Sequence, residues 1–315
     1  MLFRSVYVVA TGSLSSLPLA VLPTAAPLGD DQDAAALRKT PWLFQRYALA
    51  TLPSVASLKA VRKAAEAPSV RGPAFAGFGD PALSGAAGQD AVPRGFDAYY
   101  RNGHGDPGAL KSLPQLPGSR TELATLARTL KAPAASVISG AEATETAVKR
   151  ADLSHTKVVA FATHGLLAGE LDGLSEPALV FTPPSEPSDL DDGLLTATEA
   201  ASLKLAADWV VLSACNTAAP DGQGGLAAGG EGLSGLARGF FHAGARSLLV
   251  SHWRIRDDAA AQLTTSTLRW YARDPRLGRA GALRKAMNEM LFDRRHPEFA
   301  QPAYWAPFVV AGEAG

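Results

Sequence analysis

Two apolar segments of the chain end in side chains that can carry out nucleophilic and acid–base chemistry. The segment VVAFATHG ends in His164 and Gly165, and the segment WVVLSAC ends in Cys215. A free thiol has a pKa of about 8.5, so a nearby imidazole would assist its attack on a carbonyl carbon at neutral pH. The backbone N–H groups of Gly165 and Cys215 would then hold the oxyanion of a tetrahedral intermediate.

Both reactive residues also have a structural interpretation. A lone cysteine at a strand end is more often a small buried hydrophobe, and a lone histidine is more often a hydrogen-bonded structural residue. Here, however, two separate strands end in the two residue types that one mechanism needs. This coincidence favours the catalytic interpretation. The remaining histidines lack this context and are interpreted as structural, although His252 also follows a predicted strand: His104, His155, His242, His252 and His296.

The composition limits the partners and cofactors that we expect. The chain has 315 residues, 47% of them hydrophobic, which is enough for a sizeable core. Thirty basic and thirty acidic residues cancel, so no overall charge favours nucleic acid or an anionic membrane. A single cysteine excludes an internal disulfide and a cysteine-based zinc site, and we expect neither a metal nor another cofactor.

The first residues allow two interpretations. Arg4, an apolar stretch and small residues resemble a secretory signal, but Thr11-Gly12-Ser13 and Pro18 interrupt the apolar stretch. We favour a buried strand over Val6–Ala10. No run reaches the roughly 18 apolar residues that a membrane span needs, and a free thiol fits a reducing compartment. We therefore expect a cytoplasmic protein without a membrane partner.

Short apolar runs alternate with segments of helical period, which predicts an α/β fold with a mainly parallel sheet. Ser119-Arg120-Thr121-Glu122 and Thr196-Ala197-Thr198-Glu199 are typical of capping boxes, and Asp257 is a candidate N-cap. A helix over Glu231–Ala243 should end at Gly244. The predicted strands are Val6–Ala10, Ala74–Phe78, Val137–Ser139, Lys157–Thr163, Ala178–Thr182, Trp209–Ala214, Arg246–Trp253 and Phe308–Ala311.

Between Pro81 and Pro117 the pattern gives way to glycine, proline and polar residues, which predicts an exposed linker. Two further motifs are interpreted as incidental. Gly230-Glu231-Gly232-Leu233-Ser234-Gly235 matches a dinucleotide fingerprint, but a long loop separates it from the preceding strand. The acidic residues Asp189, Asp191 and Asp192 are interpreted as a solvated loop rather than a metal site.

Several motifs in order resemble the CHAT domain family, a family of caspase-like cysteine peptidases. They are FATHG, GLLTATEAASLKL, WVVLSACNT and GGEGLSGLARGFFHAGARSLLVSHW, with LPLAVLP, FGDP, LPGSRTEL and YWAPFVVAG in support. The resemblance covers nearly the whole chain. It implies a caspase-like three-layer α/β/α sandwich with a mainly parallel sheet. It divides the chain into an N-terminal part of the domain (1–83), a linker (84–117) and a catalytic part (118–315).

The resemblance also implies roles for individual residues. His164 and Cys215 match the family's catalytic dyad, and Gly165 matches the oxyanion-hole donor. A substrate is expected to lie extended along the strand near Arg246–Trp253, with Ser251 and Trp253 in the wall of the pocket for the residue before the scissile bond.

The chain departs from the family pattern directly after that strand. It reads RIRDD, so Arg254 and Arg256 could change the charge of the pocket. Asp257 could favour a basic substrate residue, although an acidic residue at the start of a helix is the more common interpretation.

Two classes of function follow. One is a cysteine endopeptidase that cleaves a protein or peptide substrate and is regulated by a partner or a missing sensor region. Because the family domain is often found beside tetratricopeptide repeats, such a region would be the regulator. The other is a catalytically silent interaction module of the same fold.

Overall fold

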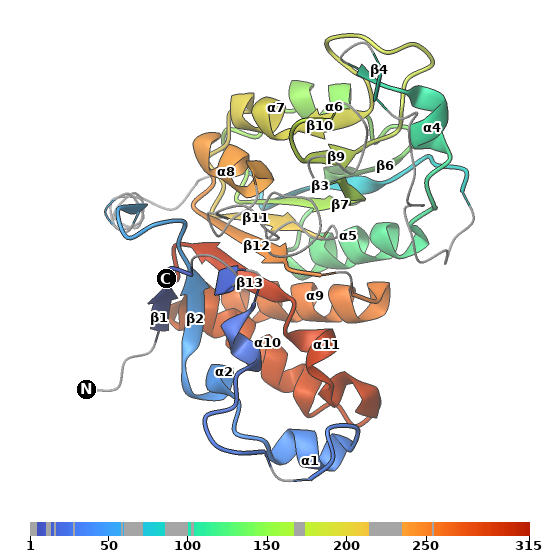
Figure 1. Cartoon of the computed structure of the whole chain (residues 1–315). Coiled ribbons are helices and arrows are strands. Elements are labelled where there is room, and N and C mark those ends of the chain that lie inside the picture. The colour runs from blue at the N-terminus through green and yellow to red at the C-terminus, as the bar shows by residue number, and fades with distance from the viewer. Residues whose placement is uncertain are drawn as a thin grey trace.

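The computed structural model describes residues 5–10, 14–15, 17–27, 29–57, 59, 72–85, 100–101, 104–166, 174–213, 235–253 and 255–315. Within these residues one eight-stranded sheet has the order β1-β2-β13-β12-β11-β7-β3-β6 (Figure 1). The strands are β1 (Ser5–Val8), β2 (Ala48–Thr51), β3 (Phe75–Pro81), β6 (Val137–Gly140), β7 (Val158–Ala162), β11 (Trp209–Leu212), β12 (Ser247–Ser251) and β13 (Phe308–Gly312).

Neighbouring strands of this sheet run parallel except for β12 and β13. Two sets of strands therefore run in opposite directions, with β12, β11, β7, β3 and β6 in one set and β13, β2 and β1 in the other. The carboxyl ends of β7, β11 and β12 consequently lie at the same edge. This edge is where an open parallel sheet usually binds ligands.

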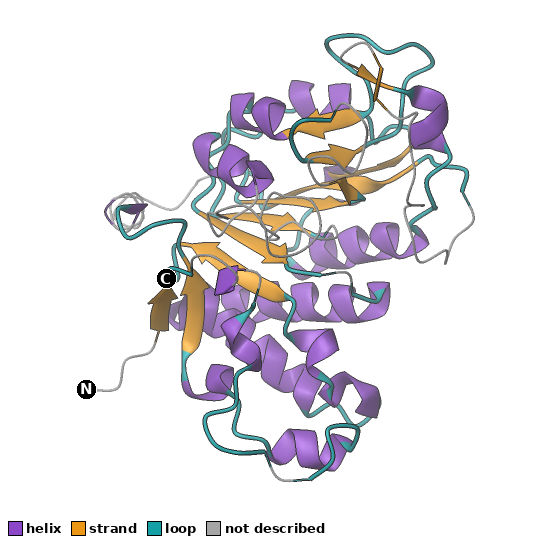
Figure 2. Cartoon of the chain, in the orientation of Figure 1, coloured by secondary structure: helices purple, strands orange, loops and turns teal. Residues whose placement is uncertain are grey.

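Helices cover both faces of the sheet (Figure 2). The helices of the described part of the chain are α1 (Ala34–Lys39), α2 (Leu43–Arg46), α4 (Pro107–Lys111), α5 (Pro117–Thr129), α6 (Glu145–Arg150), α7 (Ala197–Ser202), α8 (Gly235–His242), α9 (Asp257–Arg273), α10 (Gly278–Leu291) and α11 (Pro302–Trp305), of which α4 packs on the smaller sheet described below. The side chains of successive strand residues enter opposite cores. Val211 packs with α5, α9 and α10, whereas Val210 and Leu212 pack with α7 and α8. The predicted three-layer α/β/α sandwich with a mainly parallel sheet is confirmed.

A smaller antiparallel sheet lies beside this sandwich. It contains β8 (Gly165–Leu166), β9 (Ala178–Val180) and β10 (Leu194–Thr196), and a two-stranded sheet joins β4 (Tyr100–Arg101) to β5 (His104–Gly105). The segment predicted as a strand over Ala178–Thr182 thus belongs to this separate sheet. Val180 of this segment packs in a third hydrophobic core together with Leu110 and Leu113.

The helix starts agree only in part with the predicted capping signals. Thr196 and Glu199 form the predicted capping box of α7. The box predicted over Ser119–Glu122 was wrong, because α5 begins earlier, with Pro117 at a first-turn position that proline favours. Asp257 is the first residue of α9 and not its N-cap. Gly244 follows α8 with a φ of 111°, as the predicted helix stop requires, whereas residues 231–234 lie outside the described ranges.

The three-part division of the chain stays a prediction. Much of the expected linker lies outside the described residues, but its described part is not all exposed. It contains α4, and Leu110 and Leu113 are buried. Strands from both sides of the linker share one sheet, since β3 pairs with β6 and β7. None of the described helices is long and apolar enough to cross a membrane.

Candidate active site

His164 lies beside the end of the strand that leads to Cys215. β7 and β11 pair in parallel up to Phe161 and Leu212, and the Ser213 N–H donates to the Phe161 carbonyl at 2.9 Å. The two strands that the sequence required to be neighbours are therefore neighbours. Cys215 lies outside the described residues, which end at Ser213 on this strand.

One pocket joins these strand ends to α5 and α9, and we call it the strand-end pocket. It contains His164, Ser213 and three residues from or near the end of β12. The described residues that line it are Leu116, Ser119, Glu122, Thr163, His164, Ser213, Ser251, Trp253, Ile255, Asp257, Ala260 and Phe308. The pocket thus brings together four of the residues that the sequence analysis predicted for the site, which are His164, Ser251, Trp253 and Asp257.

A backbone carbonyl orients the His164 ring. His164 is only 5% exposed, and its Nε2 lies 2.8 Å from the Pro114 oxygen. A carbonyl oxygen only accepts hydrogen bonds, so Nε2 carries a proton in this contact. In the neutral ring Nδ1 is then the nitrogen without a proton. The Pro114 carbonyl thus fixes the tautomer of His164.

Gly165 begins β8 next to the pocket. The Val180 N–H donates to the His164 carbonyl at 2.9 Å, and Gly165 lies opposite Leu179 in the antiparallel pair. This hydrogen bond makes Gly165 and Leu179 a non-hydrogen-bonded pair, so the Gly165 N–H points away from β9. The Thr163 hydroxyl fixes the same turn by donating to the Val180 carbonyl.

Glu122 is a carboxyl group buried at the inner end of the pocket. It is 4% exposed, and its two oxygens contact the Ser213 hydroxyl at 2.9 Å and the Thr264 hydroxyl at 2.8 Å. Burial raises the pKa of Glu122 from 4.5 to about 7, with a smaller contribution from the Asp257 carboxylate, although the two hydroxyl groups act in the opposite direction.

The hydroxyl of Thr264 has two acceptors within hydrogen-bond distance. It lies 2.9 Å from the Ala260 carbonyl and 2.8 Å from the Glu122 carboxyl group, to which it donates. This bond favours the ionised carboxylate, but the effect of burial is larger. Glu122 therefore changes its charge in the neutral pH range.

The charge of the pocket is acidic. Asp257 is exposed at its rim, and no lysine or arginine is among the described lining residues. Arg256 turns to Asp258 and Glu298 instead, with N–O distances of 2.5 and 3.5 Å, and lies over the rings of Phe299 and Tyr304. Arg254 lies outside the described residues. The expectation that Arg256 changes the charge of the pocket was wrong.

The pairing of β12 limits where a substrate could lie near Arg246–Trp253. β13 pairs with every residue of β12, and β11 pairs with Leu248 and Leu249 on the other side. A substrate strand cannot add to these occupied edges. The accessible part is the end of the strand, where Ser251 and Trp253 line the pocket and the Trp253 indole donates to the Ala303 carbonyl at 3.2 Å.

Sequence reasoning missed Glu122 and Pro114. Glu122 was interpreted as part of a capping box, yet its position beside Leu123 and Leu126 on the apolar side of α5 was a signal of burial. A charged residue on a buried helix face needs a partner or a function. The role of Pro114 had no signal, because the interacting atom belongs to the backbone.

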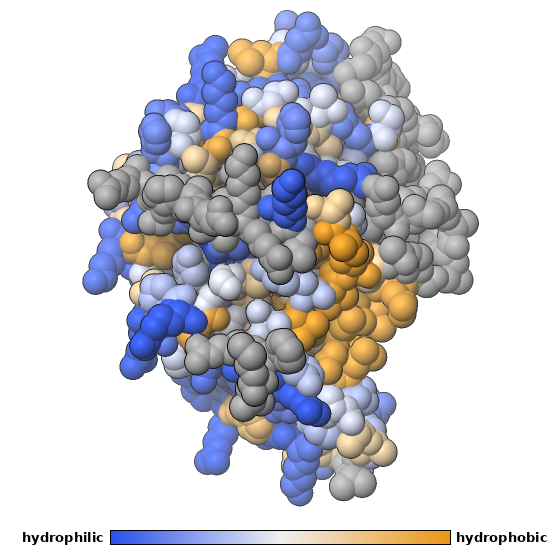
Figure 3. Space-filling model, turned by 90° about the vertical axis from the view of Figure 1, so that its left-hand side faces the viewer, coloured by the Kyte–Doolittle hydropathy of each residue, from blue (hydrophilic) through white to orange (hydrophobic). Residues whose placement is uncertain are grey.

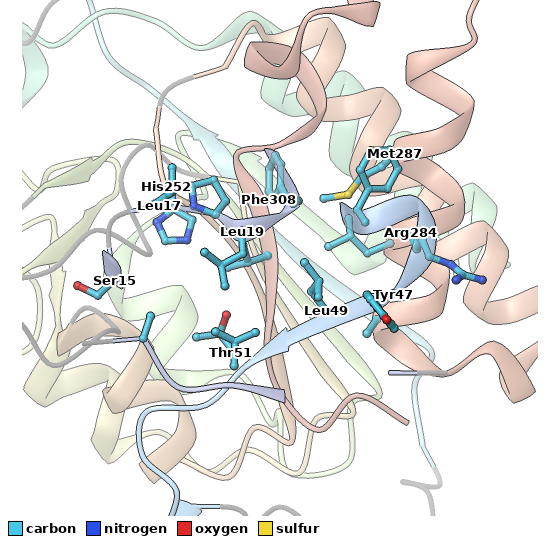
Figure 4. A pocket seen from close by; sticks show the side chains of 18 residues that line it. Ser15, Leu17, Leu19, Tyr47, Leu49, Thr51, His252, Arg284, Met287 and Phe308 are labelled. Atoms are coloured by element: carbon cyan, nitrogen blue, oxygen red, sulfur yellow. The ribbon is translucent and has the colours of Figure 1, made fainter. Parts of the chain in front are cut away.

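His252 lines a different pocket, shown in Figure 4, between β2, β13 and α10. Burial lowers the pKa of its imidazole from 6.5 to about 4, and its Nδ1 has no hydrogen-bond partner among the described residues. Apolar side chains such as Leu19, Leu49 and Met287 dominate this pocket. Figure 3 shows hydrophobic residues gathered on the side of the molecule where β1 and β2 lie.

The acidic loop is more ordered than the sequence predicted. Asp192 is buried and accepts hydrogen bonds from the N–H groups of Gly105 and Leu194, so its interpretation as solvated was wrong. Asp189 is exposed and lies 3.5 Å from His104. The described residues contain no group of three or more side chains placed to hold a metal ion. The glycine-rich motif over 230–235 lies outside the described residues except for Gly235, which begins α8.

Comparisons with solved structures find distant relatives. The Saccharomyces cerevisiae separase–securin complex is 13% identical with a TM-score of 0.45, over 85% of this chain and 14% of that chain. The Arg-specific cysteine proteinase gingipain R is 12% identical with a TM-score of 0.46, over 84% of this chain and 54% of that chain. The present chain thus spans a small part of the separase chain and about half of the gingipain chain. No curated protein matches it.

The sequence profile of the CHAT domain matches residues 2–313, nearly the full length of the chain. This match agrees with the ordered motifs and with the α/β/α sandwich. The chain therefore belongs to the CHAT domain family and has its caspase-like cysteine peptidase fold.

Proposed function

We propose that the chain is a cysteine endopeptidase that uses Cys215 and His164. The Cys215 thiol gives its proton to His164 Nδ1 as the sulfur attacks the peptide carbonyl carbon, and a C–S bond forms as the carbonyl π electrons move to oxygen. The tetrahedral intermediate collapses, the C–N bond breaks, and His164 gives a proton to the departing amine. Water then gives a proton to His164 as its oxygen attacks the thioester carbonyl. The C–S bond breaks, the departing sulfur takes that proton from His164, and the acid product and free thiol are released.

The observation that carries the proposal is the shared edge of β7 and β11. His164 follows one strand, and Cys215 follows the other with only Ala214 between it and the described Ser213. Both His164 and Ser213 line the strand-end pocket. Proton exchange between an acid–base group and a nucleophile needs such proximity before any tuning of pKa values.

Two further contacts support this proposal. The hydrogen bond from His164 Nε2 to the Pro114 carbonyl leaves Nδ1 as the proton-transfer atom. The Gly165 N–H points away from β9, which suits a donor to the oxyanion, with the Cys215 N–H as the second donor. Ser251 and Trp253 would form the wall beside the substrate residue, and Asp257 the rim.

We also propose that a partner or a further region with tetratricopeptide repeats regulates this activity. The support is the family to which the chain belongs, and the substrate is a protein or an extended peptide. The expected location is the cytoplasm, where a free thiol stays reduced.

The test combines labelling with turnover. The purified chain is incubated with peptide acyloxymethyl ketones, and modification of Cys215 is located by mass spectrometry. A diverse peptide library is then screened for cleavage. We expect labelling at neutral pH that His164→Gln slows strongly, and cleavage that Cys215→Ala abolishes. Circular dichroism of both variants controls for folding.

The alternative function, a catalytically silent interaction module, makes the opposite prediction. A folded chain whose Cys215 is not labelled by any probe, and that cleaves no peptide, would support it. Cleavage that survives Cys215→Ala would contradict the proposed mechanism directly, because Cys215 is the only cysteine in the sequence.

A further inference from the structure

The strand-end pocket combines apolar walls with a carboxyl group at its inner end. We propose that Glu122 is the specificity-determining residue and that the pocket accepts the side chain of a lysine or arginine before the scissile bond. This inference deepens the proposed peptidase function and rests on it. Asp257 supplies a second carboxylate at the rim.

The order of side chains in the pocket matches a long cationic side chain. Leu116, Ile255 and Phe308 offer apolar surface to a methylene stem. Glu122 is buried and Asp257 is exposed. A side chain that enters the pocket past Asp257 would therefore bring its charged end to the Glu122 carboxyl group. Lysine and arginine bury their stems against apolar surface and keep their charge on a polar partner.

The two hydroxyl contacts do not use all the hydrogen-bond acceptor capacity of Glu122. Each carboxylate oxygen contacts one hydroxyl, from Ser213 or Thr264, and an ionised carboxylate accepts about four hydrogen bonds. An ammonium or guanidinium group could thus donate to Glu122 while both hydroxyl contacts are kept. It would also balance the negative charge that burial disfavours.

In the described part of the chain, the two neighbouring arginines pair with other carboxylates and not with Glu122. Arg120, on the same helix, bonds to Asp80 at 2.7 Å, and Arg256 bonds to Asp258. Neither arginine lines the pocket. An acidic or neutral substrate side chain would leave Glu122 without a cationic partner, whereas a basic one would pair with it.

The groups that face Glu122 determine how the preference should depend on pH. They are Ser213 directly after β11, Thr264 and Asp257 from α9, and His164 after β7 in the same pocket. Since the pKa of the empty Glu122 carboxyl is about 7, the ionised fraction rises about tenfold between pH 6 and pH 8. The preference for a basic residue should rise with it.

The experiment compares two peptide acyloxymethyl ketones that differ in one group. One carries lysine at the position before the reactive carbonyl, and the other carries norleucine, which lacks the charge. We expect the lysine probe to label Cys215 at least about tenfold faster at pH 8, as a charge-assisted hydrogen bond implies. Because both probes report the same thiol, titration of His164 cancels in the ratio of their rates.

The matched variants are Glu122→Gln and Glu176→Gln. Glu176 also accepts two hydrogen bonds, both from Thr198 at 2.8 Å, but it is outside the pocket. We expect Glu122→Gln to bring the ratio of rates close to one and to remove its rise with pH. Glu176→Gln should keep both the ratio and the rise.

The outcomes separate this inference from the proposed function. Labelling that is as fast with norleucine as with lysine supports the peptidase and overturns the inference. If neither probe labels Cys215, the proposed function fails, and agmatine then decides the inference in isothermal titration. Binding of agmatine that Glu122→Gln removes supports a basic-side-chain pocket, and absence of binding overturns it.

Discussion

Replacing Glu122 by glutamine should make the protein more stable at alkaline pH and change its stability little at acid pH. The carboxyl group is buried against Ser213 and Thr264, and its pKa rises from 4.5 to about 7 on folding. The folded protein therefore holds a proton that the unfolded chain loses above pH 4.5. Stability is fully present below pH 4.5 and is lost as pH rises through 7.

The size of the effect follows from the two pKa values. Each pKa unit corresponds to about 1.4 kcal/mol, so the free energy of unfolding falls by about 3 kcal/mol between pH 4.5 and pH 8. Glutamine has nearly the same shape and does not ionise. Both hydroxyl groups can adapt to it, because a hydroxyl donates and accepts. Relative to the wild type, Glu122→Gln should gain about 3 kcal/mol over that range.

Urea unfolding followed by circular dichroism measures this difference at a series of pH values. Thermal unfolding should show a matching gain of about 5 °C in Tm at pH 8. Glu176→Gln is the control, because this half-buried carboxylate has similar hydrogen bonds but stays in contact with water. Wild-type and Glu122→Gln curves that run parallel from pH 4.5 to pH 8 would refute the reasoning.

Three further predictions concern other parts of the sheet and its helices. Burial lowers the pKa of His252 to about 4, so the free energy of unfolding of the wild type should fall by up to about 3 kcal/mol as pH drops from 6.5 to 4. His252→Gln should lack this fall. Free energies from urea unfolding that depend equally on pH in both proteins would contradict it. A Cβ on Gly79 would lie 2.2 Å from the Ala162 carbonyl oxygen, so Gly79→Ala should lower the free energy of unfolding by about 3 kcal/mol, whereas Gly108→Ala, whose nearest atom is at 3.3 Å, should be nearly neutral. Arg279 is buried with Asp208 and Glu313, so Arg279→Leu should cost about 3–5 kcal/mol, and a loss as small as that of the exposed Arg276→Leu would argue against a buried ion-pair role.

The sequence predicted the central strands better than the peripheral ones. β7 and β11 are apolar on successive residues, as strands covered on both faces are, and the structure confirms their pairing. β2 has the sequence ALAT, which is short and rich in alanine, a residue that also favours helices. Its strand conformation depends on pairing with β1 and β13, which no local pattern reveals.

The candidate site was predictable only where a reactive side chain followed a recognisable strand. His164 met that condition, and its place beside the end of β11 follows from the parallel pairing. Cys215 met the same condition, and its role stays a prediction because it lies outside the described residues. Glu122 comes from a helix and Pro114 from a loop, so their approach to the site depends on packing between distant segments.

The position of β13 has a consequence for how the protein is made. β13 is the strand that joins β2, near the beginning of the sequence, to β12, through the pairs Val310–Ala50 and Ser251–Phe308. During synthesis, β1 and β2 therefore cannot reach their place in the sheet until residues 308–312 of β13 have left the ribosome. The N-terminal strands must wait with unpaired edges, which exposes them to aggregation or to chaperones. Completion of the sheet should thus be a slow step, because it joins strands that are far apart in the sequence.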